Sequence, residues 1–130
     1  MPGGLVYPEL SYELIGSSFK VFNSMGFGYQ EKYYQRAYAE ELRNKGIKFE
    51  REKEIVLVYN KKCIGKYFLD FLVEDKVIIE LKIIPFIKHI HIKQVLEYLN
   101  VTNKKLAILI YFTKEGIKYK RVINPNLENY

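Results

Sequence analysis

The sequence has little of what disulfide-stabilised, zinc-bound or membrane-spanning proteins require. Its 130 residues include one cysteine, Cys63, which excludes an internal disulfide and a zinc site built on several cysteines. No apolar run approaches the roughly 20 residues that cross a bilayer. The first ten residues lack a basic segment followed by an apolar core, so no secretory signal is expected. These absences favour a protein of the reducing cytoplasm.

What the chain does contain fits one domain that spans residues 1–130. Hydrophobic residues make up 48% of it, enough for one buried core, and no repeat, linker or low-complexity segment divides it. Lys and Arg number 21 against 15 Asp and Glu, which leaves a net charge of +6. This excess favours a polyanionic partner such as nucleic acid, although a generally lysine-rich composition explains it equally well.

Residue periodicity predicts helices and strands in one mixed sheet. Helical spacing of apolar residues indicates helices over residues 8–26, 29–46 and 89–100. Apolar and alternating runs indicate strands over residues 47–52, 54–60, 63–73, 76–84, 104–112 and 117–123. The order of these elements describes an α/β sandwich with an antiparallel meander and one crossover helix.

Three ionisable residues interrupt the apolar hairpin "DFLVEDKVIIELK": Asp70, Glu80 and Lys82. A two-residue loop would set Asp70 opposite Ile79 and turn Glu80 to the other face. A three-residue loop at 74–76 sets Asp70 opposite Glu80, although such loops often need a glycine that is missing here. The second register is preferred because it gathers the charged residues on one face. It sets Phe68 opposite Lys82 and leaves one apolar face, made of Leu69, Phe71, Val73, Val77, Ile79 and Leu81.

Two carboxylates that face each other repel unless a cation lies between them. Mg²⁺ takes oxygen ligands and commonly combines one or two carboxylates with waters. Lys82, two residues after Glu80, could balance this charge or help to deprotonate an attacking water, as phosphodiester hydrolysis requires. The alternative is an exposed face with ordinary surface charge. The apolar residues Phe68, Leu72 and Ile78 on the same face argue against it.

The hairpin residues resemble the motif of the PD-(D/E)XK nuclease superfamily. Asp70, followed ten residues later by Glu80-x-Lys82, matches it, although Leu69 stands where a proline often precedes the Asp. The resemblance implies that Asp70 and Glu80 bind Mg²⁺ or Mn²⁺, with the Leu81 backbone carbonyl as a third ligand. It also implies that Lys82 is the catalytic lysine.

Two further motifs lie on the expected helices. "GYQEKYY" matches G-x-x-E-x-x-Y at Gly28, Glu31 and Tyr34, the signature of the GxxExxY family within that superfamily. Gln94 and Tyr98 match the Q-x-x-x-Y motif of RecB-like members. The resemblance implies that Glu31 reaches the metal, directly or through water. It also implies that Gln94 and Tyr98, four residues apart on one helix face, position water or a phosphate.

The resemblance covers about residues 10–123 and implies a three-layer α/β/α sandwich, restriction endonuclease-like, with a central four-stranded mixed sheet flanked by helices. The function it implies is a metal-dependent nuclease, with DNA as the expected substrate. A structure-selective Holliday-junction resolvase is one alternative, and it would need a homodimer. A non-catalytic nucleic-acid-binding module and an interaction module of a toxin or defence system are others. The complete set of Glu31, Asp70, Glu80 and Lys82 argues against the binding module, which has no need for the acids, and leaves the interaction module open.

Residues outside the hairpin also have ordinary structural explanations. Glu31 could favour a helix dipole, Gln94 could be a buried amide, and Tyr98 could be a core residue. Glu31 lies three residues before Tyr34 and is therefore expected on the same inward stripe. Cys63 is expected to be a buried strand residue.

Overall fold

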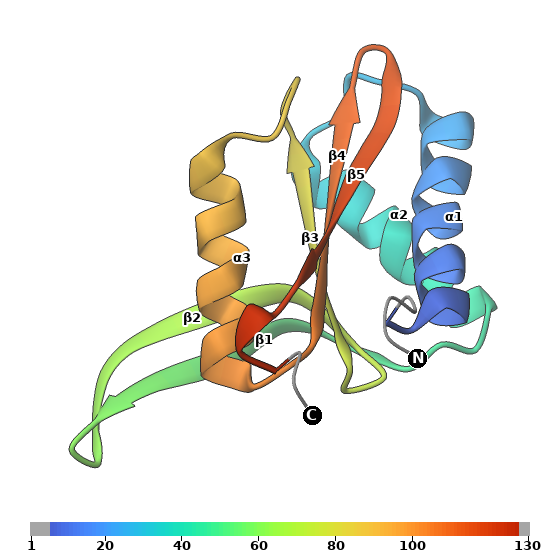
Figure 1. Ribbon diagram of the computed structural model, residues 1–130. Coiled ribbons are helices and arrows are strands. Elements are labelled where there is room, and N and C mark those ends of the chain that lie inside the picture. Colours follow the sequence, from blue (N-terminus) through green and yellow to red (C-terminus); the bar gives the residue numbers. More distant parts are fainter. Residues whose placement is uncertain (1–5, 128–130) are drawn as a thin grey trace.

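The structure, a computed structural model, describes residues 6–127 as a mixed five-stranded sheet flanked by helices (Figure 1). The strand order β1-β2-β3-β4-β5 follows the chain: β1, β2 and β3 form an antiparallel meander, β3 and β4 are parallel, and β5 is antiparallel to β4. The strands are β1 (Phe49–Tyr59), β2 (Lys62–Val73), β3 (Val77–Ile83), β4 (Leu106–Thr113) and β5 (Gly116–Ile123). The helices are α1 (Pro8–Met25), α2 (Glu31–Asn44), α3 (His89–Thr102) and a short 3-10 turn at Pro125–Leu127.

Helices cover both faces of the sheet, which confirms the three-layer α/β/α sandwich. Figure 1 shows α1 and α2 on one side of β3 and β4, and α3 on the other. Each helix layer buries its own cluster of apolar side chains against the sheet. The parallel pairing of β3 and β4 follows from the crossover through α3. Among the described residues, no helix is long and apolar enough to cross a membrane.

The apolar stripe predicted for the second helix is buried as expected. Tyr34, Tyr38 and Leu42 are fully buried in the cluster under α1 and α2. The Tyr38 hydroxyl donates a hydrogen bond to the Leu14 carbonyl at 2.8 Å, so this buried polar group is satisfied. Burial raises the pKa of Tyr38, which keeps the hydroxyl protonated. These contacts fix α2 against α1 and thereby fix the position of the first residue of α2.

The sheet differs from the expectation in its first strands. Residues 47–52 and 54–60, expected as two strands, belong to the single strand β1, and the sheet has five strands where the resemblance implied four. The apparent break coincides with Glu52, whose φ of 49° is left-handed. Burial alternates regularly through this residue, but the run of five charged residues at 50–54 hides the continuity of the strand in a sequence pattern.

Strands β1 and β2 extend well beyond the rest of the sheet. Strand β2 pairs with β3 only over residues 71–73, whereas it pairs with β1 from Val73 to Lys62. The pair therefore continues as a two-stranded arm, which curves past α3 at the lower left of Figure 1. Cys63 lies near the tip of this arm and is exposed, so its predicted burial is wrong. The helices do not reach far enough to cover it.

Candidate functional site

The hairpin between β2 and β3 has the three-residue loop that was preferred from the sequence. Val73 pairs with Val77, which leaves residues 74–76 as the loop. Two of these loop residues adopt φ of 53° and 55°, the left-handed region that glycine normally supplies. The backbone thus makes the turn without a glycine, and the register sets Asp70 opposite Glu80.

The regular ladder between β2 and β3 ends at this pair, and the two carboxylates take over its hydrogen bonds. The Asp70 backbone N–H donates to Glu80 Oε2 at 2.8 Å, and the Leu81 backbone N–H donates to Asp70 Oδ2 at 2.9 Å. These reciprocal bonds hold both side chains in place. Each carboxylate keeps one oxygen, Asp70 Oδ1 and Glu80 Oε1, that accepts no hydrogen bond within residues 6–127.

Burial of the pair opposes its ionisation. Glu80 is only 2% exposed, and burial, followed by the negative charge of Asp70, raises the pKa of Glu80 to about 8. Burial likewise raises the pKa of Asp70 to about 6, although the Leu81 N–H and the positive charge of Lys82 act in the opposite direction. Two shielded carboxylates that repel each other and have free oxygens fit a hard divalent cation, which would offset both the burial and the repulsion.

We expect the metal-free protein to lose stability as the pH rises from about 5 to about 8. The raised pKa values mean that folded Asp70 and Glu80 retain protons in a range where the unfolded chain has lost them. Unfolding then releases protons, so the free energy of unfolding should fall by on the order of 3 kcal/mol over this range. Urea denaturation in a chelator at the two pH values measures the fall.

The double variant Asp70→Asn/Glu80→Gln provides the control, because its amides do not titrate. It should lose most of the pH dependence that the wild type shows. Equal pH dependence in the two proteins would mean that these carboxylates ionise as freely as in an unfolded chain.

Lys82 lies beside the acid pair without being tied to it. It follows Glu80 by two residues in the regular strand β3, so its side chain is on the same face of the sheet, as predicted. Its positive charge lowers the pKa of both Asp70 and Glu80. Among the described residues, however, it makes no ion pair with either carboxylate. Burial and the charges of Lys82 and Lys88 lower the pKa of His91, which places His91 near this group.

The distortion of β2 at Asp70 overturns two details of the predicted hairpin. Leu69 packs in the cluster under α3, apart from Phe71 on the opposite face, so the expected unbroken apolar face does not include it. Phe68 pairs with Glu54 of β1 and does not oppose Lys82. Both differences arise because β2 leaves β3 at the acid pair and bends away with β1.

Glu31 is the first residue of α2, and its charge acts on the acid pair. It is exposed, so its predicted place on the inward stripe is wrong; α2 begins there, and its first turn leaves this side chain uncovered. The negative charge of Glu31 nevertheless raises the pKa of both Asp70 and Glu80. Within residues 6–127, no group of three or more His, Cys, Asp or Glu side chains surrounds a common metal position.

The two residues of the Q-x-x-x-Y motif lie on α3 in different surroundings. Tyr98 is almost buried, and its ring packs against Tyr67 with centroids 5.3 Å apart. Burial, followed by the negative charges of Glu80 and Asp70, raises the pKa of Tyr98 to about 12. Tyr98 therefore borders the acid pair. Gln94, one turn earlier, is exposed, and its side chain makes no hydrogen bond within the described residues.

Sequence reasoning missed one acidic residue of this neighbourhood. The neighbouring pairs, Arg51 with Phe71 and Lys53 with Leu69, set Glu52 opposite Asp70. The charge of Glu52 raises the pKa of Asp70. Glu52 is exposed and has the left-handed φ described above. The signal that could have revealed it is the charged run at 50–54, which was interpreted as the boundary between two strands.

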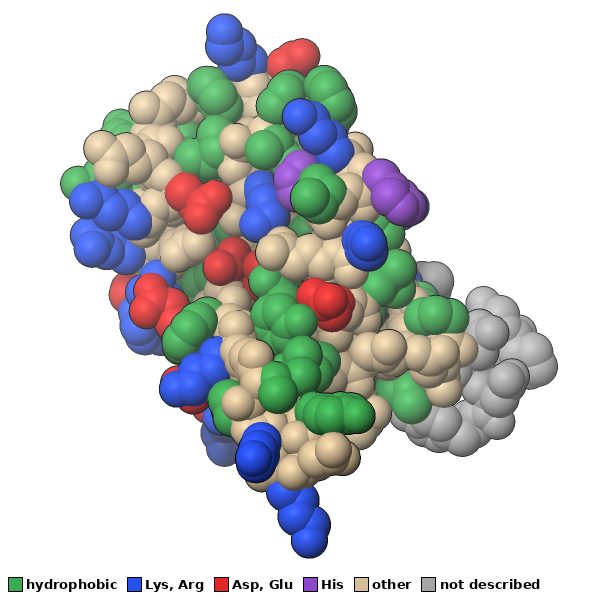
Figure 2. Space-filling view, turned by 90° about the vertical axis from the view of Figure 1, so that its left-hand side faces the viewer, with side chains coloured by type: hydrophobic (Ala, Val, Ile, Leu, Met, Phe, Trp, Pro, Cys, Tyr) green, Lys and Arg blue, Asp and Glu red, His purple; other side chains and the backbone are tan. Residues whose placement is uncertain are grey.

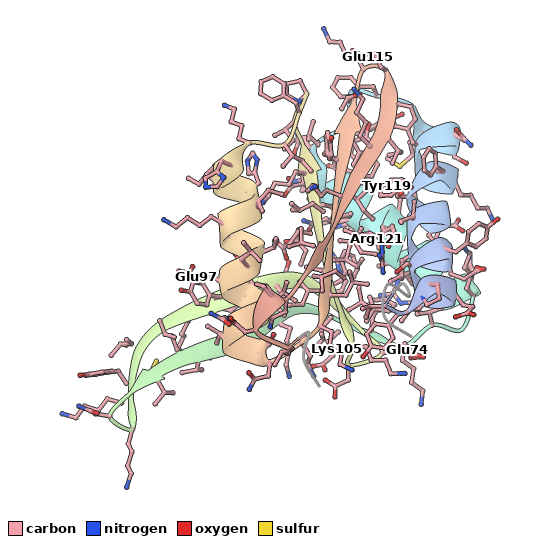
Figure 3. The ribbon with its side chains drawn as sticks, viewed as in Figure 1. Glu74, Glu97, Lys105, Glu115, Tyr119 and Arg121 are labelled. Atoms are coloured by element: carbon pink, nitrogen blue, oxygen red, sulfur yellow. The ribbon has the colours of Figure 1, made fainter. Side chains whose placement is uncertain are left out.

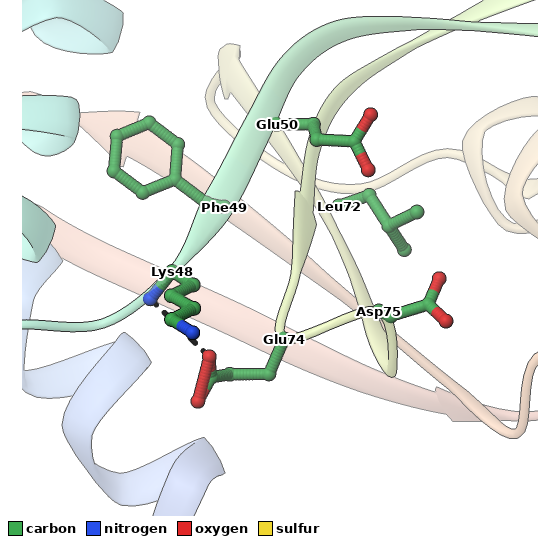
Figure 4. Close-up of a pocket in the computed structure, with 6 residues that line it drawn as sticks. All are labelled: Lys48, Phe49, Glu50, Leu72, Glu74 and Asp75. Carbon is green, nitrogen blue, oxygen red and sulfur yellow. Dashed lines mark hydrogen bonds between the residues drawn. The ribbon is translucent and has the colours of Figure 1, made fainter.

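The acid pair is on the α3 side of the sheet, because Glu80 shares a face of β3 with Ile78, which packs under α3, and α3 lies to the left of β3 in Figure 1. Figure 2 shows this side, with acidic side chains near its middle close to a basic and a histidine side chain. A separate hollow of about 330 Å³ lies at the turn end of the β2–β3 hairpin (Figure 4). There the Lys48 backbone N–H donates to Glu74 Oε2 at 3.2 Å. Neither Asp70 nor Glu80 lines that hollow, so it is not part of the candidate site.

Comparisons with known proteins bear on the family and the fold of the chain. Residues 8–122 match the family model described as the PD-(D/E)XK nuclease superfamily. The structure resembles the crystal structure of SSO0001, at 16% identity and a TM-score of 0.51, over 92% of this chain and 80% of that one. It also resembles an alkaline exonuclease from Laribacter hongkongensis, at 12% identity and a TM-score of 0.52, over 84% and 77%. These low identities show likeness of fold alone, and no curated protein sequence matches the chain.

Proposed function

Because the chain belongs to the PD-(D/E)XK nuclease superfamily, we propose that it is a metal-dependent nuclease that hydrolyses the phosphodiester bonds of DNA. Membership supports a nuclease with a nucleic-acid substrate, and the likeness to an exonuclease fold agrees with it. The observation that carries the proposal is the reciprocal bonding of Asp70 and Glu80. It holds two repelling carboxylates side by side, each with one oxygen left for a ligand.

The proposed cofactor is Mg²⁺ or Mn²⁺, since PD-(D/E)XK nucleases generally use divalent metals. Asp70, Glu80 and the Leu81 carbonyl would hold it, and Glu31 would approach it directly or through water. When bound, such a cation lowers the pKa of water and polarises a phosphoryl oxygen. The free oxygens of the acid pair fit this group because hard cations prefer carboxylate and carbonyl oxygens.

The other residues of the site would act on the phosphate or on the attacking water. Lys82 keeps its ammonium out of an ion pair and beside the acids, where it can stabilise charge that develops on the phosphate. Tyr98 keeps its hydroxyl protonated next to the same acids and can donate a hydrogen bond. Gln94, exposed one turn before Tyr98, can contact the phosphate of a bound strand.

We also propose that the chain is a member of the GxxExxY family, because its signature has a structural explanation here. Gly28 adopts a φ of 122°, which side chains rarely allow. The Tyr34 hydroxyl donates to the Gly26 carbonyl, and the Tyr29 backbone N–H donates to that hydroxyl at 3.4 Å. The signature therefore shapes the loop between α1 and α2 that presents Glu31 to the acid pair.

Incubation with labelled single- and double-stranded DNA and RNA tests the proposed function. We expect cleavage with Mg²⁺ or Mn²⁺ and none in a chelator. Binding should weaken steeply with salt. A chain with a net charge of +6 binds through contacts to phosphates, and each contact releases counterions from the nucleic acid. Binding without cleavage under every metal tried would identify a non-catalytic nucleic-acid-binding module.

A further inference from the structure

The two-stranded arm consists of residues 53–59 of β1 and 62–69 of β2, joined by a tight turn. Within residues 6–127, the part of β2 from Lys62 to Leu69 pairs with β1 alone, and the ladder runs to the pair Tyr59 and Lys62. Asn60 and Lys61 at the tip adopt φ of 49° and 64°, the two left-handed positions of a tight hairpin turn. The arm is therefore a paired two-stranded ribbon up to its turn, with one shift of register between Leu57 and Val58.

One side of the arm rests on α3. The rings of Tyr67 and Tyr98 pack together, and Ile55, which pairs with Tyr67, belongs to the same apolar cluster. The Tyr67 hydroxyl interacts with Glu97, the α3 residue labelled in Figure 3 at the level where the arm passes. This packing fixes the base of the arm relative to the acid pair, which Tyr98 also borders.

The remainder of the arm exposes apolar side chains that no part of residues 6–127 covers. Phe68 is 56% exposed, although it lies two residues before Asp70. Other exposed apolar side chains of the arm are Val56, Val58, Tyr59 and Ile64. In the lower part of Figure 2, where the arm comes toward the viewer, hydrophobic side chains adjoin the acidic ones at the middle of the face. An exposed apolar surface of this kind next to a site marks a binding surface.

The charge of the arm indicates what binds there. Residues 55–69 contain three lysines and no Asp or Glu. Lys66 pairs with Glu54 of the opposite strand at 3.5 Å, but Lys61 and Lys62 have no acidic partner in the described chain. Lysines beside exposed aromatic rings suit a nucleic-acid strand, because lysines contact phosphates and rings stack on bases.

The apolar character of the surface favours unpaired bases over a duplex. A duplex hides the faces of its bases and presents mostly phosphates, which would leave Phe68 and its apolar neighbours without a partner. An unpaired strand presents both its phosphates and its base faces. Phe68 is about 7 Å along the strand from Asp70, close to one nucleotide step from the acid pair.

We propose that the arm holds an unpaired stretch of the substrate strand beside the acid pair, with Phe68 stacked on a base next to the scissile phosphate. The proposal rests on the nuclease function above and adds to it a preference for single-stranded substrate or unpaired ends. Phe68 thus acts as a binding residue that selects the substrate, whereas the acid pair and Lys82 act at the phosphate.

The absence of tryptophan from the chain allows a direct optical test. In Phe68→Trp the new indole is the sole tryptophan, and a stacked base should quench its fluorescence. Tyr12→Trp is the matched control, because Tyr12 is 78% exposed on α1, outside the arm. In a chelator, a single-stranded oligonucleotide should quench Phe68→Trp and leave Tyr12→Trp unchanged, and a duplex should quench far less. Equal quenching by duplex, or none in Phe68→Trp despite binding, would overturn the proposal.

Removing the Phe68 ring shows how much it contributes to the affinity for a single strand. Phe68→Ala should weaken binding of the single strand about tenfold by fluorescence anisotropy, whereas Tyr12→Ala should not change it. Metal-dependent cleavage that is untouched by Phe68→Ala would refute the role of the arm and leave the nuclease standing. Quenching without cleavage under any metal would refute the nuclease and leave the arm as a binding surface.

Sedimentation tests whether the arm instead joins two copies of the chain. A dimer that Phe68→Ala dissociates would show this and would overturn the proposal.

Discussion

Lys82→Ala should slow single-turnover cleavage by about a hundredfold or more, the loss expected when one preorganised electrostatic group is removed. Lys82 lies beside Asp70 and Glu80 but forms no ion pair with either among the described residues. Its positive charge is therefore available to a substrate phosphate. That contribution is larger in the transition state than in the bound ground state. Substrate affinity should therefore change little, since other basic residues of the chain contact the phosphates.

Lys114→Ala is the control for this experiment, because Lys114 is an exposed lysine in the turn between β4 and β5. Its cleavage rate should equal that of the wild type. Melting temperatures measured on the same samples separate chemistry from unfolding. If Lys82→Ala is folded and cleaves at the wild-type rate, Lys82 has no part in the mechanism. If its activity falls only in proportion to unfolded protein, Lys82 serves the fold.

Asp70→Asn should abolish both metal binding and cleavage while leaving the fold intact. Mg²⁺ or Mn²⁺ should raise the melting temperature of the wild type, as any ligand specific to the folded state does, and the variant should show no rise. The amide oxygen can still accept the Leu81 N–H, so the bond that closes the site survives. Without metal the variant should be at least as stable as the wild type, because its neutral amide neither repels Glu80 nor resists burial.

Glu80→Gln should behave in the same way, since its amide oxygen can still accept the Asp70 N–H. Glu97→Gln is the control, a neutralised acid on α3 outside the pair. It should retain the metal-induced rise. A rise that persists in both Asp70→Asn and Glu80→Gln would place the metal elsewhere.

The sequence predicted the register of the hairpin because a charged side chain is costly on a buried apolar face. Only the three-residue loop gathers Asp70, Glu80 and Lys82 on one face, and the structure has that loop. The missing glycine was a poor guide, since Glu74 and Asp75 adopt the left-handed conformation themselves. Helix bounds were also close, because proline, glycine and the spacing of apolar residues mark them locally.

The sequence did not predict which core Leu69 enters or whether Cys63 is covered, because both depend on how β1 and β2 bend past the helices. Leu69 and Phe71, two residues apart in β2, lie in opposite cores, whereas strict alternation places them on one face. Cys63 was expected to be buried because its strand looks apolar, yet the arm extends past the helices that would cover it. The motifs indicated which residues to consider, and the fold shows that Glu31 is exposed at the start of α2, where its charge acts on both acids.

The most direct test of the account is a crystal structure of the wild-type protein soaked in Mn²⁺ at about pH 8, with an anomalous difference map. The account predicts a peak about 2.0–2.2 Å from free oxygens of Asp70 and Glu80 and from the Leu81 carbonyl, with ordered waters completing the shell. A peak held by other residues, or an empty acid pair in a crystal of protein that cleaves DNA with Mn²⁺ in solution, would contradict it.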